Sequence, residues 1–138
     1  VFRLARRRLQ SRGRPAMNPV LVDSCVWIRH FRQRNPLLVN LLEDGEVWCH
    51  PIVVGELSMG NLKNRQQTIF DLAKLNRPPI ATFAETRQMI EARRLWGRGI
   101  QWNDARILAS AILGQVPLWT FDLRLGEIAK ELGVGFVG

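Results

Sequence analysis

Four acidic side chains of this 138-residue chain stand inside or directly after apolar runs, where a solvated carboxylate is not expected. A charge in such a setting is costly to desolvate without a partner, and like charges would also repel one another. The sequence shows no matching cluster of bases, so the acids need a shared counter-charge. A hard divalent cation prefers oxygen ligands and can activate water for attack on a phosphodiester. The four acids are Asp23 after "VLV", Glu56 within "IVVGEL", Asp104 in "NDARILASAIL" and Asp122 after "LWTF".

Each of these acids also has a purely structural interpretation. Asp23 and Asp122 could be helix caps, and Glu56 could pair with a buried arginine. Asp104 falls in the first turn of a predicted helix, where the helix dipole favours a carboxylate by about 0.3 to 1 kcal/mol. Because all four share the same problem, a common metal site explains them better than four separate structural roles.

The elements that would position these acids alternate along the chain. We expect a capping box at Thr82 and Glu85, and an N-cap at Asn103 for the helix that carries Asp104. This alternation, without linkers or repeats, predicts one α/β domain with a small parallel sheet, whose ligands bind at the carboxyl ends of the strands. The spacing predicts strands at 19–23, 47–48, near 80, 116–121 and 134–137, and helices over 24–31, 35–45, 50–62, 65–75, 82–99, 103–114 and 122–133.

The net charge of +8 is concentrated at the start of the chain, because residues 1–16 hold six arginines and no acid. Removing those six charges leaves +2 for residues 17–138. We expect 1–16 to be a basic extension, either a disordered arm or, as we favour, sequence that precedes a native start at Met17. Neither a secretory signal nor a membrane span is expected, so we expect a cytoplasmic protein.

Cys25 and Cys49 form no metal-binding motif and are expected to be reduced core residues.

At the four acids, the sequence resembles the PIN domain, and specifically the VapC toxins of bacterial type II toxin–antitoxin systems. The resemblance covers residues 17–138. The segment "VLVDSCVWI" matches the opening strand with its first catalytic acid, and "IVVGELSMG" matches the motif with the helical glutamate. The segment "NDARILASAIL" matches the third acidic motif, and "LWTFDLRL" matches the last one, with Thr120 in its Thr-x-Asp arrangement.

This resemblance implies a PIN-like α/β/α sandwich and a Mg²⁺-dependent endoribonuclease, with Mn²⁺ as the alternative ion. Its expected substrate is structured RNA such as tRNA or rRNA. It also implies a homodimer that is neutralised by a cognate VapB-type antitoxin, whose basic C-terminal segment enters the acidic groove. The catalytic and metal-binding residues would be Asp23, Glu56 and Asp104, with Asp122 completing the cluster or holding a second ion.

Further residues are predicted to assist these acids. Ser24 and Thr120 are candidates to contact the metal ligands, with a helix cap and an ordinary strand threonine as the alternatives. Trp102 could stack an RNA base or simply pack. His30 and His50 are given no catalytic part. Arginines near Asp104 are candidates to bind RNA phosphates, or else form a solvated helix face: Arg93, Arg94, Arg98 and Arg106.

Two other classes of function compete with a nuclease. Phosphoryl transfer through an aspartate nucleophile also places acids at strand ends, but a haloacid-dehalogenase site needs a second aspartate where Cys25 stands. A receiver domain needs an acidic pair near the first strand and a lysine on the last strand, and neither is apparent. The non-enzymatic alternative is a PIN-like module that binds RNA or a partner without cutting, and the four retained acids count against it.

Overall fold

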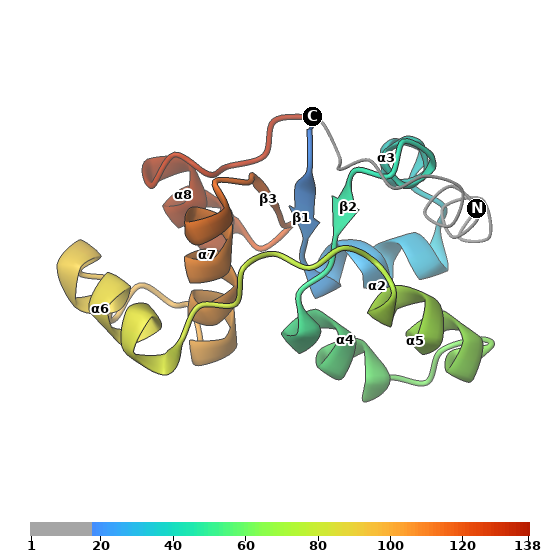
Figure 1. Cartoon of the computed structure of the whole chain (residues 1–138), viewed down its shortest axis with the longest axis horizontal. Coiled ribbons are helices and arrows are strands. Elements are labelled where there is room, and N and C mark those ends of the chain that lie inside the picture. The colour runs from blue at the N-terminus through green and yellow to red at the C-terminus, as the bar shows by residue number, and fades with distance from the viewer. Residues whose placement is uncertain (1–17) are drawn as a thin grey trace.

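A small parallel sheet lies at the centre of the protein in the computed structural model, which describes residues 18–138 (Figure 1). The sheet contains β1 (Val20–Val22), β2 (Val47–Trp48) and β3 (Leu118–Trp119) in the order β2–β1–β3. Leu21 of the central strand pairs with Trp48 on one side and with Leu118 on the other. Every residue of β1 is buried, as expected for a parallel strand that is covered on both faces.

Helices cover both sides of this sheet. Figure 1 shows α7 and α8 on one side of the strands, and α2, α4 and α5 on the other. Helix α2 packs against α4, and α6 packs against α7. The arrangement confirms the predicted α/β/α sandwich with a small parallel sheet. The helices are α2 (Ser24–Arg32), α3 (Pro36–Glu43), α4 (Pro51–Ser58), α5 (Arg65–Ala73), α6 (Phe83–Arg93), α7 (Trp102–Gly114) and α8 (Leu123–Glu131).

Local capping determines where several helices begin and end. The predicted capping box of α6 is confirmed, because the Thr82 side chain accepts from the Glu85 N–H and the Glu85 carboxylate accepts from the Thr82 N–H. The prediction of Asn103 as an N-cap was wrong: α7 begins at Trp102 and Gln101 is its N-cap. Helix α6 also ends earlier than predicted, at Arg93, before a left-handed residue with φ of 53°.

Two predicted strands do not form. The segment near Ile80 is irregular, and Ile80 is 44% exposed. At 134–137 the chain makes an isolated parallel bridge between Leu118 and Gly135 in place of a strand. Glycine weakens a strand interior, and β3 itself is two residues long, so the ladder ends at this bridge.

A buried histidine ties three segments of the fold together. His50 is 1% exposed and is the N-cap of α4, where its Nδ1 accepts the Ile52 N–H at 2.9 Å. The proton is therefore on Nε2, which donates to the Ser110 hydroxyl at 3.2 Å. That hydroxyl also accepts the Ala81 N–H at 3.1 Å. These hydrogen bonds of His50 and Ser110, which we call the His50 latch, hold the start of α4 against the middle of α7. The two helices carry Glu56 and Asp104.

The predicted extension over residues 1–16 lies outside the described residues. Within 18–138, no helix is long and apolar enough to cross a membrane.

Candidate metal-binding active site

Asp23 occupies the carboxyl end of the central strand and is the N-cap of α2. Its Oδ1 accepts the Ser24 N–H at 2.9 Å, and its Oδ2 accepts the Thr120 hydroxyl at 2.8 Å. The residue is only 5% exposed. Both carboxylate oxygens are thus held by donors, which orients the group.

Asp122 is brought beside Asp23 by the pairing of β1 with β3. It is the N-cap of α8, where its Oδ1 accepts the Leu125 N–H at 3.0 Å. Its own N–H donates to Thr120 Oγ1 at 3.1 Å. The Thr120 hydroxyl therefore bridges the two acids: it donates to Asp23 and accepts from the backbone of Asp122.

Asp104 enters the same region from the first turn of α7. Its Oδ2 accepts the Gln101 N–H at 3.0 Å, which shows why this helix begins at its observed position. Burial raises the pKa of the Asp104 carboxyl, the Gln101 N–H lowers it, and the negative charges of Asp23 and Asp122 raise it further. The structural interpretation of Asp104 as an acid of the first helical turn is therefore confirmed, and the same carboxylate lies near two other acids.

Glu56 projects from α4, and its side chain is exposed, so the prediction that it is buried among apolar neighbours was wrong. The apolar residues beside it in sequence turn to the core, where Val53 and Leu57 are buried. Partial desolvation raises the pKa of Glu56, the charges of Asp23 and Asp104 raise it further, and a hydrogen bond with the Ser24 side chain lowers it. Ser24 thus lies between two of the acids.

The carboxylates are close enough to affect one another's ionisation, and their oxygen donors suit a hard divalent cation. Within 18–138, no three acidic, histidine or cysteine side chains form a ready-made metal-ligand group. Carboxylate oxygens are the ligands that Mg²⁺ prefers, and this ion usually keeps several of its water ligands.

Cys25 belongs to this site, and its interpretation as a simple core residue was incomplete. It is a free, half-buried cysteine whose Sγ lies 3.4 Å from Asp23 Oδ2 and 3.3 Å from Thr120 Oγ1. The Sγ also accepts the Phe121 N–H at 3.3 Å. Burial is the main reason that the pKa of its thiol is raised, so the group is a protonated thiol at neutral pH. The sequence feature that could have predicted this role is the position of Cys25, two residues after Asp23.

The predicted RNA-binding arginines occupy different settings. Arg98 makes two hydrogen bonds with the Glu131 carboxylate, at 2.7 and 2.8 Å. Arg106 lies close enough to lower the pKa of His50. Arg93 and Arg94 are exposed at the end of α6.

Arg124 was not singled out from the sequence, although it lies only two positions after Asp122. It is exposed in the first turn of α8, and a Cβ added at Gly99 would lie 2.5 Å from its Cδ. The side chain thus crosses the backbone that leads into α7, and Gly99 makes the close approach possible with a φ of +86°. Across 18–138 the structure shows no carboxylate paired with this guanidinium.

Trp102 and His30 make aromatic contacts with neighbouring residues. The ring of Trp102, 36% exposed, lies 5.2 Å from that of Phe83, which is 70% exposed. His30 accepts the Asn35 N–H and contacts Trp27 and Phe31.

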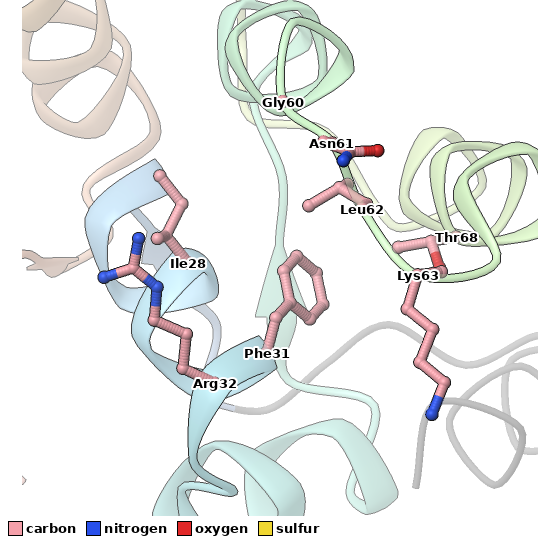
Figure 2. A pocket seen from close by; sticks show the side chains of 8 residues that line it. All are labelled: Ile28, Phe31, Arg32, Gly60, Asn61, Leu62, Lys63 and Thr68. Carbon is pink, nitrogen blue, oxygen red and sulfur yellow. The ribbon is translucent and has the colours of Figure 1, made fainter.

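A pocket of about 490 Å³ lies between α2 and the connection from α4 to α5. Figure 2 shows the Phe31 ring of α2 opposite Leu62 of that connection. Asp23 caps the start of α2, and Glu56 lies in α4, the helix that precedes this connection. The pocket is lined by Ile28, Phe31, Arg32, Gly60, Asn61, Leu62, Lys63 and Thr68.

Comparison with known proteins places these features in a family. The PIN domain matches residues 20–131. Two relatives, from the CDC 1551 and H37Rv strains of Mycobacterium tuberculosis, are both named "Ribonuclease VapC32". Each is 44% identical to the chain over 116 residues, which cover 83% of this chain and 94% of the relative.

Proposed function

Because the chain belongs to the VapC ribonucleases of the PIN-domain family, we propose that Asp23, Glu56, Asp104 and Asp122 form the catalytic metal site of an endoribonuclease toxin. The observation that carries this proposal is the mutual repulsion of the acids. Partial desolvation and neighbouring negative charges together raise the pKa values of Glu56 and Asp104, and within 18–138 no lysine or arginine is buried beside them. A bound cation would remove that repulsion.

Magnesium is the ion that we propose, with Mn²⁺ as the alternative. When bound, it would supply an activated water and neutralise charge that develops on the phosphodiester. Asp23 and Asp104 approach from the strand end and the α7 turn, Glu56 from α4, and Asp122 from α8, so four separate elements orient the ligands. One or two ions fit this proposal.

The substrate that we propose is structured RNA, such as tRNA or rRNA. Phosphate is repelled by the acids, so cations at the rim must hold the RNA backbone. Arg124 suits this role because it lies beside Asp122 and has no carboxylate partner in the described chain. Arg93, Arg94 and Arg106 stay candidates, while the guanidinium of Arg98 is engaged by Glu131.

A VapB-type antitoxin is the proposed partner, and the pocket beside α2 is its proposed docking site. The pocket offers Ile28, Phe31 and Leu62 for an apolar segment. Because α2 and α4 also carry acids of the site, a segment that fills the pocket can extend its basic end toward those acids. Neutralisation would then combine apolar anchoring with charge pairing at the carboxylates.

We propose that the toxin acts in the cytoplasm as a homodimer. Two exposed aromatic side chains that contact each other support self-association: the ring of Phe83, 70% exposed, lies 5.2 Å from that of Trp102, 36% exposed. Sedimentation equilibrium of the purified full chain tests this, and a monomer at micromolar concentration would contradict it.

The direct test of the function is cleavage of total tRNA and rRNA by the full chain. We expect cleavage with Mg²⁺ or Mn²⁺, none with excess EDTA, and none for Asp104→Asn at any metal concentration. A folded wild-type protein that binds RNA without cutting it under all these conditions would instead support the non-enzymatic binding module.

A further inference from the structure

We propose that Cys25 is a positioning residue of the metal site, which holds the connection between β3 and α8 in register with Asp23. This inference rests on the proposed function, because the group that it positions is the proposed metal-ligand set. Cys25 itself is not proposed to bind the metal or to react.

The contacts of the thiol connect two distant parts of the chain. Cys25 lies in the first turn of α2, and its Sγ accepts the N–H of Phe121, which is 96 positions away. The Sγ is also within hydrogen-bond distance of Asp23 Oδ2 and Thr120 Oγ1. One atom therefore contacts a proposed ligand, its hydroxyl partner and the backbone that leads into Asp122.

The hydrogen bonds of the Thr120 hydroxyl determine which atoms can accept the proton of the Cys25 thiol. The Thr120 hydroxyl has one proton, which it donates to Asp23, and it accepts from the Asp122 N–H. The S–H of Cys25 must therefore donate to Asp23 Oδ2 or to the remaining lone pair of Thr120 Oγ1. In both arrangements the thiol completes a closed network around the acid.

A second residue of α2 also contacts the connection between β3 and α8. Arg29, one turn after Cys25, places its guanidinium carbon 4.1 Å from the centre of the Phe121 ring. Phe121 is thus held by α2 at both its backbone and its side chain. Because Thr120 and Asp122 flank Phe121, α2 controls where their polar groups lie relative to Asp23.

Two substitutions separate this polar role from simple packing. Cys25→Val keeps the apolar volume but can neither donate nor accept a hydrogen bond, whereas Cys25→Ser keeps both abilities in a smaller side chain. Cys49→Ala is the matched control, since this second free cysteine is buried next to β2 and contacts none of the four acids. Thermal unfolding identifies the folded fraction of each variant.

The readouts are the Mn²⁺ dissociation constant of the RNA-free protein, from the electron paramagnetic resonance of free Mn²⁺, and kcat and KM for RNA. We expect Cys25→Val to weaken Mn²⁺ binding by about 10- to 100-fold and to lower kcat with KM unchanged. We expect Cys25→Ser to restore most of both losses and Cys49→Ala to change neither.

Wild-type Mn²⁺ affinity and kcat in folded Cys25→Val would overturn the inference. So would a loss in Cys25→Ser as large as that in Cys25→Val, because packing would then be the role of Cys25. If Cys25→Val does not fold, Cys25→Ala takes its place in the same comparison with Cys25→Ser. Failure of the wild-type protein to bind Mn²⁺ and cut RNA would instead contradict the proposed function itself.

Discussion

The Thr120 hydroxyl donates a 2.8 Å hydrogen bond to Asp23 Oδ2 across 97 positions of sequence, and this contact joins the two strand ends at the proposed metal site. The same oxygen accepts the Asp122 N–H, so one side chain orients two acids. The interaction exists because β1 and β3 are parallel neighbours whose carboxyl ends meet at one edge of the sheet.

Thr120→Val should disturb this arrangement while preserving side-chain shape. Asp23 would lose a donor and the Asp122 N–H would lose its acceptor, so we expect a loss of about 1 to 3 kcal/mol in the free energy of unfolding. Mn²⁺ affinity should fall by about 10-fold or more. Thr86→Val is the control, since that hydroxyl bonds only the Thr82 carbonyl within α6. Equal metal affinity in Thr120→Val and wild type would argue against the bridging role.

Asp104→Asn should abolish metal-dependent cleavage, with kcat at least about 100-fold lower, because a proposed ligand loses its charge. The amide oxygen can still accept the Gln101 N–H, so α7 keeps its start. Without metal, the melting temperature should equal or exceed that of wild type, since the repulsion by Asp23 and Asp122 is relieved. Asp44→Asn, at an exposed turn, is the control. A large drop in melting temperature would show that the carboxylate is mainly structural.

The buried latch of His50 should make stability depend on pH. Burial, followed by the nearby charges of Arg106 and Arg77, lowers the pKa of His50 from 6.5 to about 4. The unfolded chain therefore takes up a proton before the folded protein does, so this contribution to stability is lost as pH falls from about 6.5 toward 4.

His50→Asn tests that assignment, because asparagine is a good N-cap without a titrating ring. The decrease in melting temperature between pH 7 and pH 5 should be smaller in the variant than in wild type. The half-buried His30, whose pKa burial also lowers, accounts for part of the decrease and is unchanged in both proteins. Identical pH profiles would remove His50 as the cause.

RNA binding should depend on Arg124, which has no carboxylate partner in the described chain, more than on Arg98, which is paired with Glu131. The variants Arg124→Ala and Arg98→Ala test this difference. We expect Arg124→Ala to weaken RNA binding and to reduce the slope of log K against log salt by about 1, the value for one lost phosphate contact. Arg98→Ala should leave RNA binding nearly unchanged, because its guanidinium is engaged by Glu131. Filter-binding titrations of catalytically inactive Asp104→Asn at several salt concentrations provide the measurement. The opposite ranking would restore Arg98 as the RNA contact.

Phe31→Ser should release the antitoxin without impairing the nuclease. The ring is 37% exposed at the pocket beside α2, and its loss removes an apolar anchor, so we expect antitoxin affinity to fall at least about 10-fold. RNA cleavage should persist. Calorimetry with the cognate antitoxin measures the change, and Phe70→Ser, at an exposed position of α5, is the control. Unchanged affinity would place the antitoxin elsewhere.

Local sequence determined most of the elements of this protein and the identity of its acids. The apolar run of β1, the capping box at Thr82 and Glu85, and the termination of α8 before Gly133 depend on neighbouring residues, so they were predictable. The segment near Ile80 pairs with no strand of the described sheet, and the segment at 134–137 makes one bridge to the two-residue β3, which local spacing does not encode.

Only the tertiary structure decided how the site is held together. It turned Glu56 outward, placed Cys25 between Asp23 and the β3–α8 connection, and laid Arg124 across Gly99. These relationships join residues that are remote in sequence, and their energies arise from contacts made after the sheet has paired. Periodicity and capping report only the nearest few residues, so the sequence named the acids while the fold determined which side chains orient them.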